Sequence, residues 1–154
     1  MHNASVISLV FTLALAVAGR LELKEQYSPR GTSMGNKITI GIGDKAFAAT
    51  LSDNPTAAAF AKLLPLSITM TELNRNEKFA RLSTNVPVRP STPASIRTGD
   101  LMLYGSDTLV LFYQSFHTTH SYTAIGRIDD PEGLAVVLGI GDVNVTFALH
   151  KDRH

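Results

Sequence analysis

Hydrophobic and polar residues alternate with a period of two along much of this chain, a pattern that is typical of β-strands with one buried face. The first alternating run carries isoleucine at positions 38, 40 and 42. The run from Leu109 to Tyr113 is apolar without interruption, which predicts a strand buried on both faces. We expect eight strands, at residues 37–42, 45–52, 66–73 and 77–82, three within 99–128, and one at 142–149.

Two short helices are predicted between these strands. Residues 53–55 (Asp-Asn-Pro) favour a helix start, because an Asp or Asn side chain accepts hydrogen bonds from the first amides and proline has no amide hydrogen to leave unpaired. That helix should run through residues 57–64. Residues 129–132 (Asp-Asp-Pro-Glu) predict the second helix by the same reasoning, ending near Gly139. Short links between most strands indicate a mainly β fold, an eight-stranded and mostly antiparallel closed barrel with two capping helices.

Composition excludes several classes of function but does not identify the function. The 154 residues suffice for one domain, and 14 Lys plus Arg against 13 Asp plus Glu argue against a nucleic-acid partner. The chain has no cysteine, which excludes disulfides, thiolate nucleophiles, zinc–thiolate sites and iron–sulfur clusters. We expect no cofactor, and a monomer or weak oligomer.

The first residues predict export. Residues 6–18 form an uncharged apolar run that is too short for a comfortable membrane span. The run ends in Ala-Val-Ala, the small-x-small pattern of a signal peptidase site, so cleavage is expected after Ala18. No cysteine follows that would carry a lipid, and no stable membrane anchor is expected. We therefore expect a periplasmic or secreted protein with a signal peptide at 1–18, a flexible leader at 19–36 and a barrel domain at 37–150.

Several short phrases, in their order along the chain, resemble the cyclophilin barrel. Asn54–Phe60 (NPTAAAF) is similar to the start of the first cyclophilin helix, Val110–Tyr113 (VLFY) to a paired-phenylalanine strand, and Ile125–Ile128 (IGRI) to the strand before the second helix. The chain looks still more like the small bacterial cyclophilin-like barrels, whose members have no settled activity. The phrases that carry this second resemblance are residues 53–56, 99–101, 103–105 and 125–131. The resemblance covers about residues 37–149.

The chain departs from cyclophilins at the residues of prolyl isomerisation. The resemblance implies an arginine on strand three, but residues 66–73 contain none. The nearest match to the family's phenylalanine-x-arginine, Phe79–Arg81, falls on the fourth predicted strand. The glutamine-glycine-glycine stretch and the pocket tryptophan are absent, and Tyr122 stands where the family has a histidine. We therefore expect a binding module and no enzyme; the alternative is a divergent peptidyl-prolyl isomerase with Arg81 as its catalytic residue.

The candidate binding site is centred on residues 115–121 (SFHTTHS), which link two apolar strands at the mouth of the barrel. Aromatic walls with polar tips suit a peptide or small-molecule ligand. The predicted ligand-binding residues, beside the long loop of residues 83–98, are Tyr104, Phe112, Tyr113, His117, His120 and Tyr122. The competing explanation is a polar loop whose exposed histidines bind nothing.

Two kinds of chemistry are disfavoured at this loop. His117 and His120 would share a metal ion only if the loop formed a helical turn, and no third ligand is close in sequence, so we expect no metal. A hydrolase triad assembled from Ser115 or Ser121, a histidine and Asp100 would lack the nucleophile-elbow pattern.

Overall fold

The computed structural model describes residues 34–151, and the predicted signal peptide (residues 1–18) and most of the predicted leader (residues 19–36) lie outside them. Eight strands and two α-helices follow a short 3-10 turn, η1 (Met34–Asn36). Their bounds are β1 (Lys37–Ile42), β2 (Lys45–Leu51), α1 (Pro55–Ala61), β3 (Leu66–Leu73), β4 (Glu77–Arg81), β5 (Asp100–Tyr104), β6 (Thr108–Phe112), β7 (Thr123–Ile128), α2 (Leu134–Leu138) and β8 (Val143–Leu149). No helix in this part of the chain is long and apolar enough to cross a membrane.

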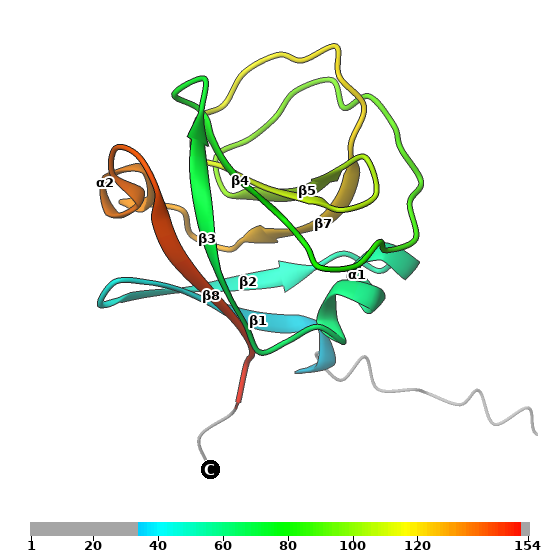
Figure 1. Cartoon of the computed structure of the whole chain (residues 1–154), viewed down its shortest axis with the longest axis horizontal. Helices are drawn as coiled ribbons and strands as arrows, with labels where there is room; N and C mark the ends of the chain where they lie inside the picture. The colour runs from blue at the N-terminus through cyan, green and yellow to red at the C-terminus, as the bar shows by residue number, and fades with distance from the viewer. Residues whose placement is uncertain (1–33, 152–154) are drawn as a thin grey trace, which may run out of the picture. The chain divides into compact units, whose positions relative to one another are not determined.

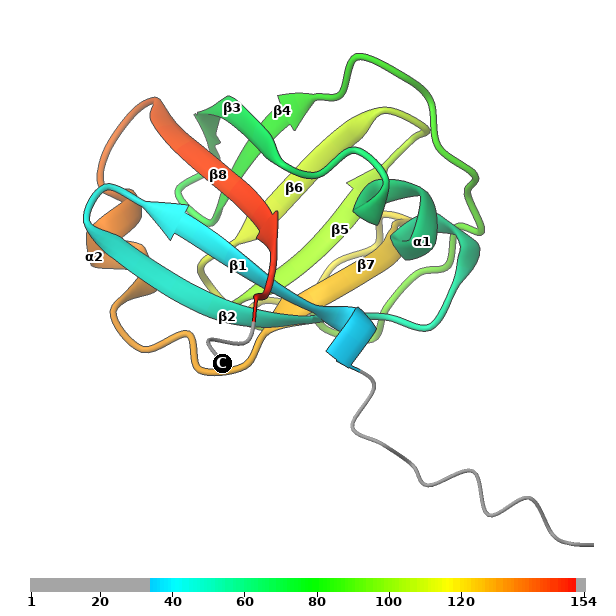
Figure 2. The same ribbon diagram turned by 90° about the horizontal axis from the view of Figure 1, so that it is seen from below.

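The eight strands form a closed barrel in the order β1-β2-β7-β5-β6-β4-β3-β8, and every neighbouring pair is antiparallel. Closure gives each of the described strands a hydrogen-bonded neighbour on both sides. The helices lie on opposite sides of the barrel in both views, α1 beside the start of β3 and α2 before β8 (Figures 1 and 2). The predicted closed barrel with two short helices is therefore confirmed.

Alternate residues of the strands fill the barrel interior. In β1, Ile38, Ile40 and Ile42 are buried, while the residues between them are partly exposed. Helix α1 adds Phe60, whose ring meets that of Phe147 in β8 edge-on, with 5.6 Å between centroids and 83° between planes. Burying a side chain of this size contributes roughly 1.5–3 kcal/mol. The period-two pattern of the sequence thus describes the core of the barrel correctly.

Helix α1 begins as predicted. The Asn54 side chain accepts a hydrogen bond from the Ala57 amide at 2.7 Å, and a proline occupies the first helical position. The amide nitrogen of the same side chain, Nδ2, donates to the Ala124 carbonyl of β7 at 2.9 Å, which links the helix to the sheet. The helix ends at Ala61, earlier than the predicted end at Leu64, and its last turn is tightened by backbone hydrogen bonds.

The predicted start of the second helix at residues 129–132 is wrong. Helix α2 begins after Gly133, whose φ of +79° suits a residue without a side chain, and no side chain caps it. Asp129 accepts hydrogen bonds from Thr50 at 2.6 Å and from Lys37 at 2.8 Å instead. Its carboxylate therefore joins the end of β7 to β1 and β2, a use that local sequence does not reveal.

Candidate ligand-binding groove

Strand β6 is buried on both faces, as its apolar sequence predicts. The two leucines of β6 join the core inside the barrel, whereas Val110 and Phe112 belong to a second hydrophobic cluster with Ile96 and Tyr122. Ile96 and Tyr122 come from the two long irregular segments that follow β4 and β6. These segments therefore fold over the outer wall of the barrel, and the candidate site is formed there.

The two segments are held against each other by paired backbone hydrogen bonds. We call them the β4–β5 loop (residues 82–99) and the β6–β7 loop (residues 113–122), and Figure 1 shows them side by side at one end of the molecule. The paired residues are Ser91 with Tyr122, at 2.9 and 3.0 Å, and Ile96 with Phe116, at 2.8 and 3.1 Å. A further hydrogen bond runs from His117 Nδ1 to the Ala94 carbonyl, at 3.2 Å. These contacts fix the two loops that form the walls of the site against each other.

A groove of about 650 Å³ opens between the β6–β7 loop and the outer face of β4 and β6, and we call it the β4–β6 groove. The turn between β3 and β4 closes one end with Asn74 and Asn76. Phe79 of β4 and Val110 of β6 contribute to its floor, and Phe116 contributes to its wall. This volume is in the range of pockets that hold small molecules or short peptides.

Four of the six predicted ligand-binding residues line this groove: Tyr104, His117, His120 and Tyr122. Phe112 lies beneath it, fully buried in the second cluster. Tyr113 is turned away, since successive side chains of an extended chain point to opposite faces. The groove also lies on the outer wall of the barrel, because Val110 and Phe112 point outward, and not at the predicted mouth.

The aromatic side chains form a continuous series of contacts. The Tyr104 ring lies 6.4 Å from that of His120 and 5.8 Å from that of Tyr122, measured between centroids. The Phe112 ring lies 5.4 Å from that of Tyr122 and 5.7 Å from that of Phe116. Edge-on and tilted pairs of this kind contribute about 0.5–1.5 kcal/mol each beyond burial. These contacts hold in place four of the rings that line the groove, those of Tyr104, Phe116, His120 and Tyr122.

Strand β4 presents three side chains to the groove. Glu77, Phe79 and Arg81 line it, while Lys78 and Ala80 are turned toward the barrel interior. Residues two apart on a strand share a face, and each residue advances the chain by about 3.3 Å, so the carboxylate and the guanidinium start from backbone positions about 13 Å apart. The groove therefore has an acidic residue at one end and a basic residue at the other.

Glu77 is the most unusual residue of the groove. It is 7% exposed, and its Oε2 atom is buried with no hydrogen-bond partner among the described residues. The Oδ1 atom of the preceding residue, Asn76, is also buried and has no hydrogen-bond partner among the described residues. Burial raises the pKa of Glu77, and the nearby negative charge of Glu72 raises it further. A buried acceptor without a donor costs about 1–3 kcal/mol, and more when it is charged.

Tyr113 belongs to a separate network on the other side of β4. Its hydroxyl donates to Glu72 at 2.7 Å, and burial together with this hydrogen bond raises the pKa of Tyr113 to about 12. Lys78 pairs with the same carboxylate at 2.7 Å and lies 5.8 Å from the tyrosine ring. Burial alone would raise the pKa of Glu72, but hydrogen bonds from Lys78 and Tyr113 outweigh it and leave the pKa lowered. This network supports the barrel, and Glu72, Lys78 and Tyr113 do not themselves line the groove.

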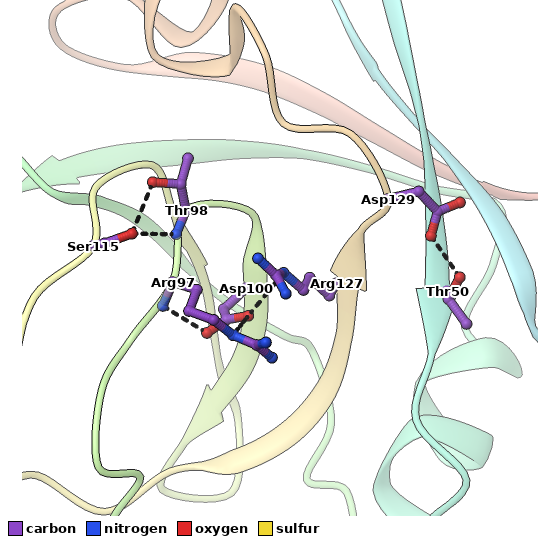
Figure 3. A network of polar contacts seen from close by, with 7 residues as sticks. All are labelled: Thr50, Arg97, Thr98, Asp100, Ser115, Arg127 and Asp129. Atoms are coloured by element: carbon purple, nitrogen blue, oxygen red, sulfur yellow. Dashed lines mark hydrogen bonds and ion pairs between the residues drawn. The ribbon is translucent and has the colours of Figure 1, made fainter.

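Asp100 fixes the end of the β4–β5 loop (Figure 3). Its Oδ2 accepts a hydrogen bond from the Arg97 amide at 2.8 Å, and its Oδ1 lies 3.6 Å from Nε of Arg127 in β7. Figure 3 also shows the β6–β7 loop attached nearby, where Ser115 Oγ accepts from the Thr98 amide at 3.0 Å. These contacts position both loops from outside the groove.

Among the described residues, neither Ser115 nor Ser121 forms a hydrogen bond with a histidine, as a hydrolase triad would require. Ser115 pairs with Thr98, the Ser121 hydroxyl lies 3.1 Å from that of Thr92, and Asp100 is engaged by arginines. Across residues 34–151, no three acidic or histidine side chains gather closely enough to hold a metal ion. His117 and His120 both line the groove.

Sequence reasoning missed several residues of the groove lining. Asn76, Glu77, Phe79 and Phe116 line it but were not among the predicted residues. A signal for two of them was present, because the alternation of β4 places Glu77 and Phe79 on the same face as Arg81. What the sequence did not reveal is that a loop covers this face and buries the carboxylate.

Comparison with known proteins supports the fold. A family model described as "Cyclophilin-like family" matches residues 40–148. The solution structure of a hypothetical protein from Archaeoglobus fulgidus superimposes with a TM-score of 0.58 and 18% sequence identity, over 76% of this chain and 96% of that chain. At this identity the likeness concerns the fold alone. No curated protein matches the chain.

Proposed function

Because the chain belongs to the cyclophilin-like family, we propose that it uses this family's barrel as a binding module, which holds a peptide or small-molecule ligand in the β4–β6 groove. The observation that carries this proposal is the groove itself: a concave space of about 650 Å³ with aromatic walls and two buried acceptors that lack partners. Native proteins keep few such acceptors, and those they keep call for an explanation. A ligand that donates to them is such an explanation.

The loop contacts support a groove with fixed walls. The β6–β7 loop is fixed to the β4–β5 loop by two pairs of backbone hydrogen bonds, and Phe112 supports it from below. Ordering a loop on binding would lower affinity, because each immobilised side chain costs about 0.5–1.5 kcal/mol. A groove that is already ordered avoids most of this loss.

The proposal can be tested by recording amide spectra of the ¹⁵N-labelled domain with a set of aromatic fragments and short peptides. Compounds that bind should shift the amide signals of the groove residues more than those of other residues. Tyr104→Ala and His120→Ala should weaken binding by about three- to tenfold, the value of one aromatic contact. Tyr113→Phe is the matched control, since it removes only the hydroxyl that bonds Glu72. Binding that is equally weakened by the control, or shifts confined to another face, would contradict the proposal.

One observation favours a second candidate, a divergent peptidyl-prolyl isomerase. Arg81 lines the same groove as Phe79 and Tyr122, and does not point to the far side of the barrel. A guanidinium that donates toward the prolyl nitrogen reduces the double-bond character of the amide, which otherwise opposes rotation by about 18–20 kcal/mol. The residue lies on β4, as the sequence predicts, and not on β3.

A protease-coupled isomerisation assay separates the two candidates. A binding module should give the uncatalysed rate. An isomerase should give a rate enhancement that Arg81→Ala abolishes, while the control Arg89→Ala, at an exposed position of the β4–β5 loop that does not line the groove, should keep it. Activity that survives Arg81→Ala would assign the catalysis to other residues.

We also propose that the protein is exported, on the sequence pattern of residues 6–18 alone. Expression of the full chain in a bacterial host, followed by fractionation and intact mass measurement, tests this. A processed protein beginning at Gly19 in the periplasm or medium is expected. Full-length protein retained in the cytoplasm would refute export.

A further inference from the structure

We propose that the ligand of the β4–β6 groove presents a cationic N–H donor, an ammonium or a guanidinium group, to the carboxylate of Glu77. This inference rests on the proposed binding function and specifies the chemistry of its ligand. It is carried by a carboxylate that lines the groove, is 7% exposed, and has a buried oxygen without a partner.

The unpartnered groups at this end of the groove are both acceptors. Glu77 Oε2 and Asn76 Oδ1 come from adjacent residues, and neither finds a donor among the described residues. The ionised carboxylate accepts and cannot donate, so in that form it needs a donor to pair with. An ammonium carries three N–H donors and a guanidinium five, so either offers several donors to this end of the groove.

The chain does not provide its own cation at this position. Lys78 is adjacent in sequence, but its side chain is turned inward, where it contacts Glu72 and two backbone carbonyls. Arg81 starts about 13 Å away along the strand. Across residues 34–151, no Lys, Arg or His nitrogen lies within ion-pair distance of the Glu77 carboxylate. A cation that pairs with Glu77 would therefore come from outside the described barrel.

The surroundings of Glu77 favour a cation attached to an apolar body. Phe79, Phe116 and Tyr122 line the same groove, and their rings offer both apolar contact and attraction to a positive charge. Removal from water strengthens the pairing of opposite charges. An anionic ligand would meet the opposite effect, because the nearby carboxylate would repel it. The raised pKa of Glu77, caused by burial and by Glu72, is consistent with a charge that lacks its counter-ion.

The test uses three aromatic probes of similar size and different charge: benzylammonium, benzyl alcohol and benzoate. Their dissociation constants are measured from amide shifts of the ¹⁵N-labelled domain. Benzylammonium should bind at least about tenfold more tightly than benzyl alcohol, the lower value of a charge-assisted hydrogen bond, and benzoate should bind most weakly. Glu77→Gln should remove the preference. Glu132→Gln, the same change at an exposed position outside the groove, should preserve it.

A second arm distinguishes a free amine from a basic side chain of a peptide. Two capped tetrapeptides are compared, alanyl-phenylalanyl-arginyl-alanine and the same peptide with citrulline in place of arginine. If the ligand is a peptide, the arginine form should bind more tightly than both the citrulline form and benzylammonium. If the ligand is a small amine, benzylammonium should show the preference and the two peptides should bind equally.

The outcomes separate this inference from the binding function. If none of the probes shifts groove amides, the groove does not bind ligands of this size and both ideas fail. If all three aromatic probes bind equally and Glu77→Gln changes nothing, the groove binds ligands but the assignment of a cation is overturned. Thermal unfolding without ligand gives an independent readout. Glu77→Gln should raise the melting temperature by removing an unpaired buried charge, and a lowered value would mean that Glu77 has a structural role instead.

Discussion

Lys78 carries a buried charge that should contribute strongly to the stability of the barrel. Its side chain is fully buried, and Nζ donates to Glu72 at 2.7 Å and to the carbonyls of Gly139 and Gly141 at 2.9 and 2.6 Å. These contacts use all three donors of the ammonium group. They join β4 to the end of β3 and to the segment between α2 and β8. Lys78→Met keeps the length and much of the volume of the side chain and removes every one of these contacts.

The expected loss can be worked out from the exposure of the partners. Removing one member of a buried ion pair costs about 3–5 kcal/mol when the remaining charge stays buried. The Glu72 side chain is 24% exposed, so water can replace part of the lost interaction, and the expected loss is at the lower end, about 3 kcal/mol. For a domain of 118 described residues, an unfolding entropy of about 2.1 cal/mol/K per residue converts this loss to about 12 °C in melting temperature.

Urea denaturation and differential scanning calorimetry of the domain provide the measurement. The urea midpoint should fall while the slope of the transition stays the same, since the folded structure is retained. Lys45→Met, at an exposed position of β2, is the control and should change stability by less than about 0.5 kcal/mol. A Lys78→Met variant as stable as the wild-type domain would show that the buried ion pair only offsets its own desolvation, and would refute the argument.

Three further predictions concern the frame of the barrel. Asn54→Ala should lower stability by about 1–2 kcal/mol, because it removes both the cap of α1 and the hydrogen bond to β7; a urea midpoint within error of wild type would contradict this. Gly126→Ala should cost about 1–3 kcal/mol, since its new methyl group would lie 2.5 Å from the backbone oxygen of Thr50, and unchanged thermal stability would show that β2 can move aside. Partial burial alone would raise the pKa of Asp129, but hydrogen bonds from Lys37 and Thr50 outweigh it and hold the pKa below its usual value. The stabilisation by Asp129 should therefore be present above about pH 4 and be lost as the pH falls through the lowered value. Melting temperatures of wild type and Asp129→Asn should differ slightly at neutral pH and converge in acid; a difference that persists in acid would assign the effect to packing.

Most of the fold was predictable because it depends on local patterns. The isoleucines of β1, the asparagine cap of α1 and the apolar run of β6 each determine their own element through neighbours in sequence. The closed barrel followed from the number of strands and the short links between them. The start of α2 was not predictable, because the carboxylate of Asp129 is taken by Thr50 and Lys37, which are distant in sequence.

The candidate site was predictable only in part, for the same reason. Tyr104, His117, His120 and Tyr122 line the groove, as aromatic and polar residues near a loop can be expected to do. Tyr113 was grouped with them, but its side chain follows the period of the strand to the opposite face and bonds Glu72. The position of the groove on the outer wall depends on how two loops pair, and no local pattern records that pairing.

The adjacent residues Glu77 and Lys78 show how structure and function can be separated on one strand. Two adjacent, oppositely charged residues in a sequence usually indicate a solvent-exposed surface. Here both side chains are buried, and they lie on opposite faces of β4. The lysine has a partner for every donor, whereas the carboxylate has a buried oxygen with none. Neutralising the lysine should therefore destabilise the barrel and leave the preference for a cationic probe intact at temperatures where the domain stays folded. Neutralising the glutamate should do the reverse, because a charge kept at a cost to stability needs a partner that the described chain does not supply.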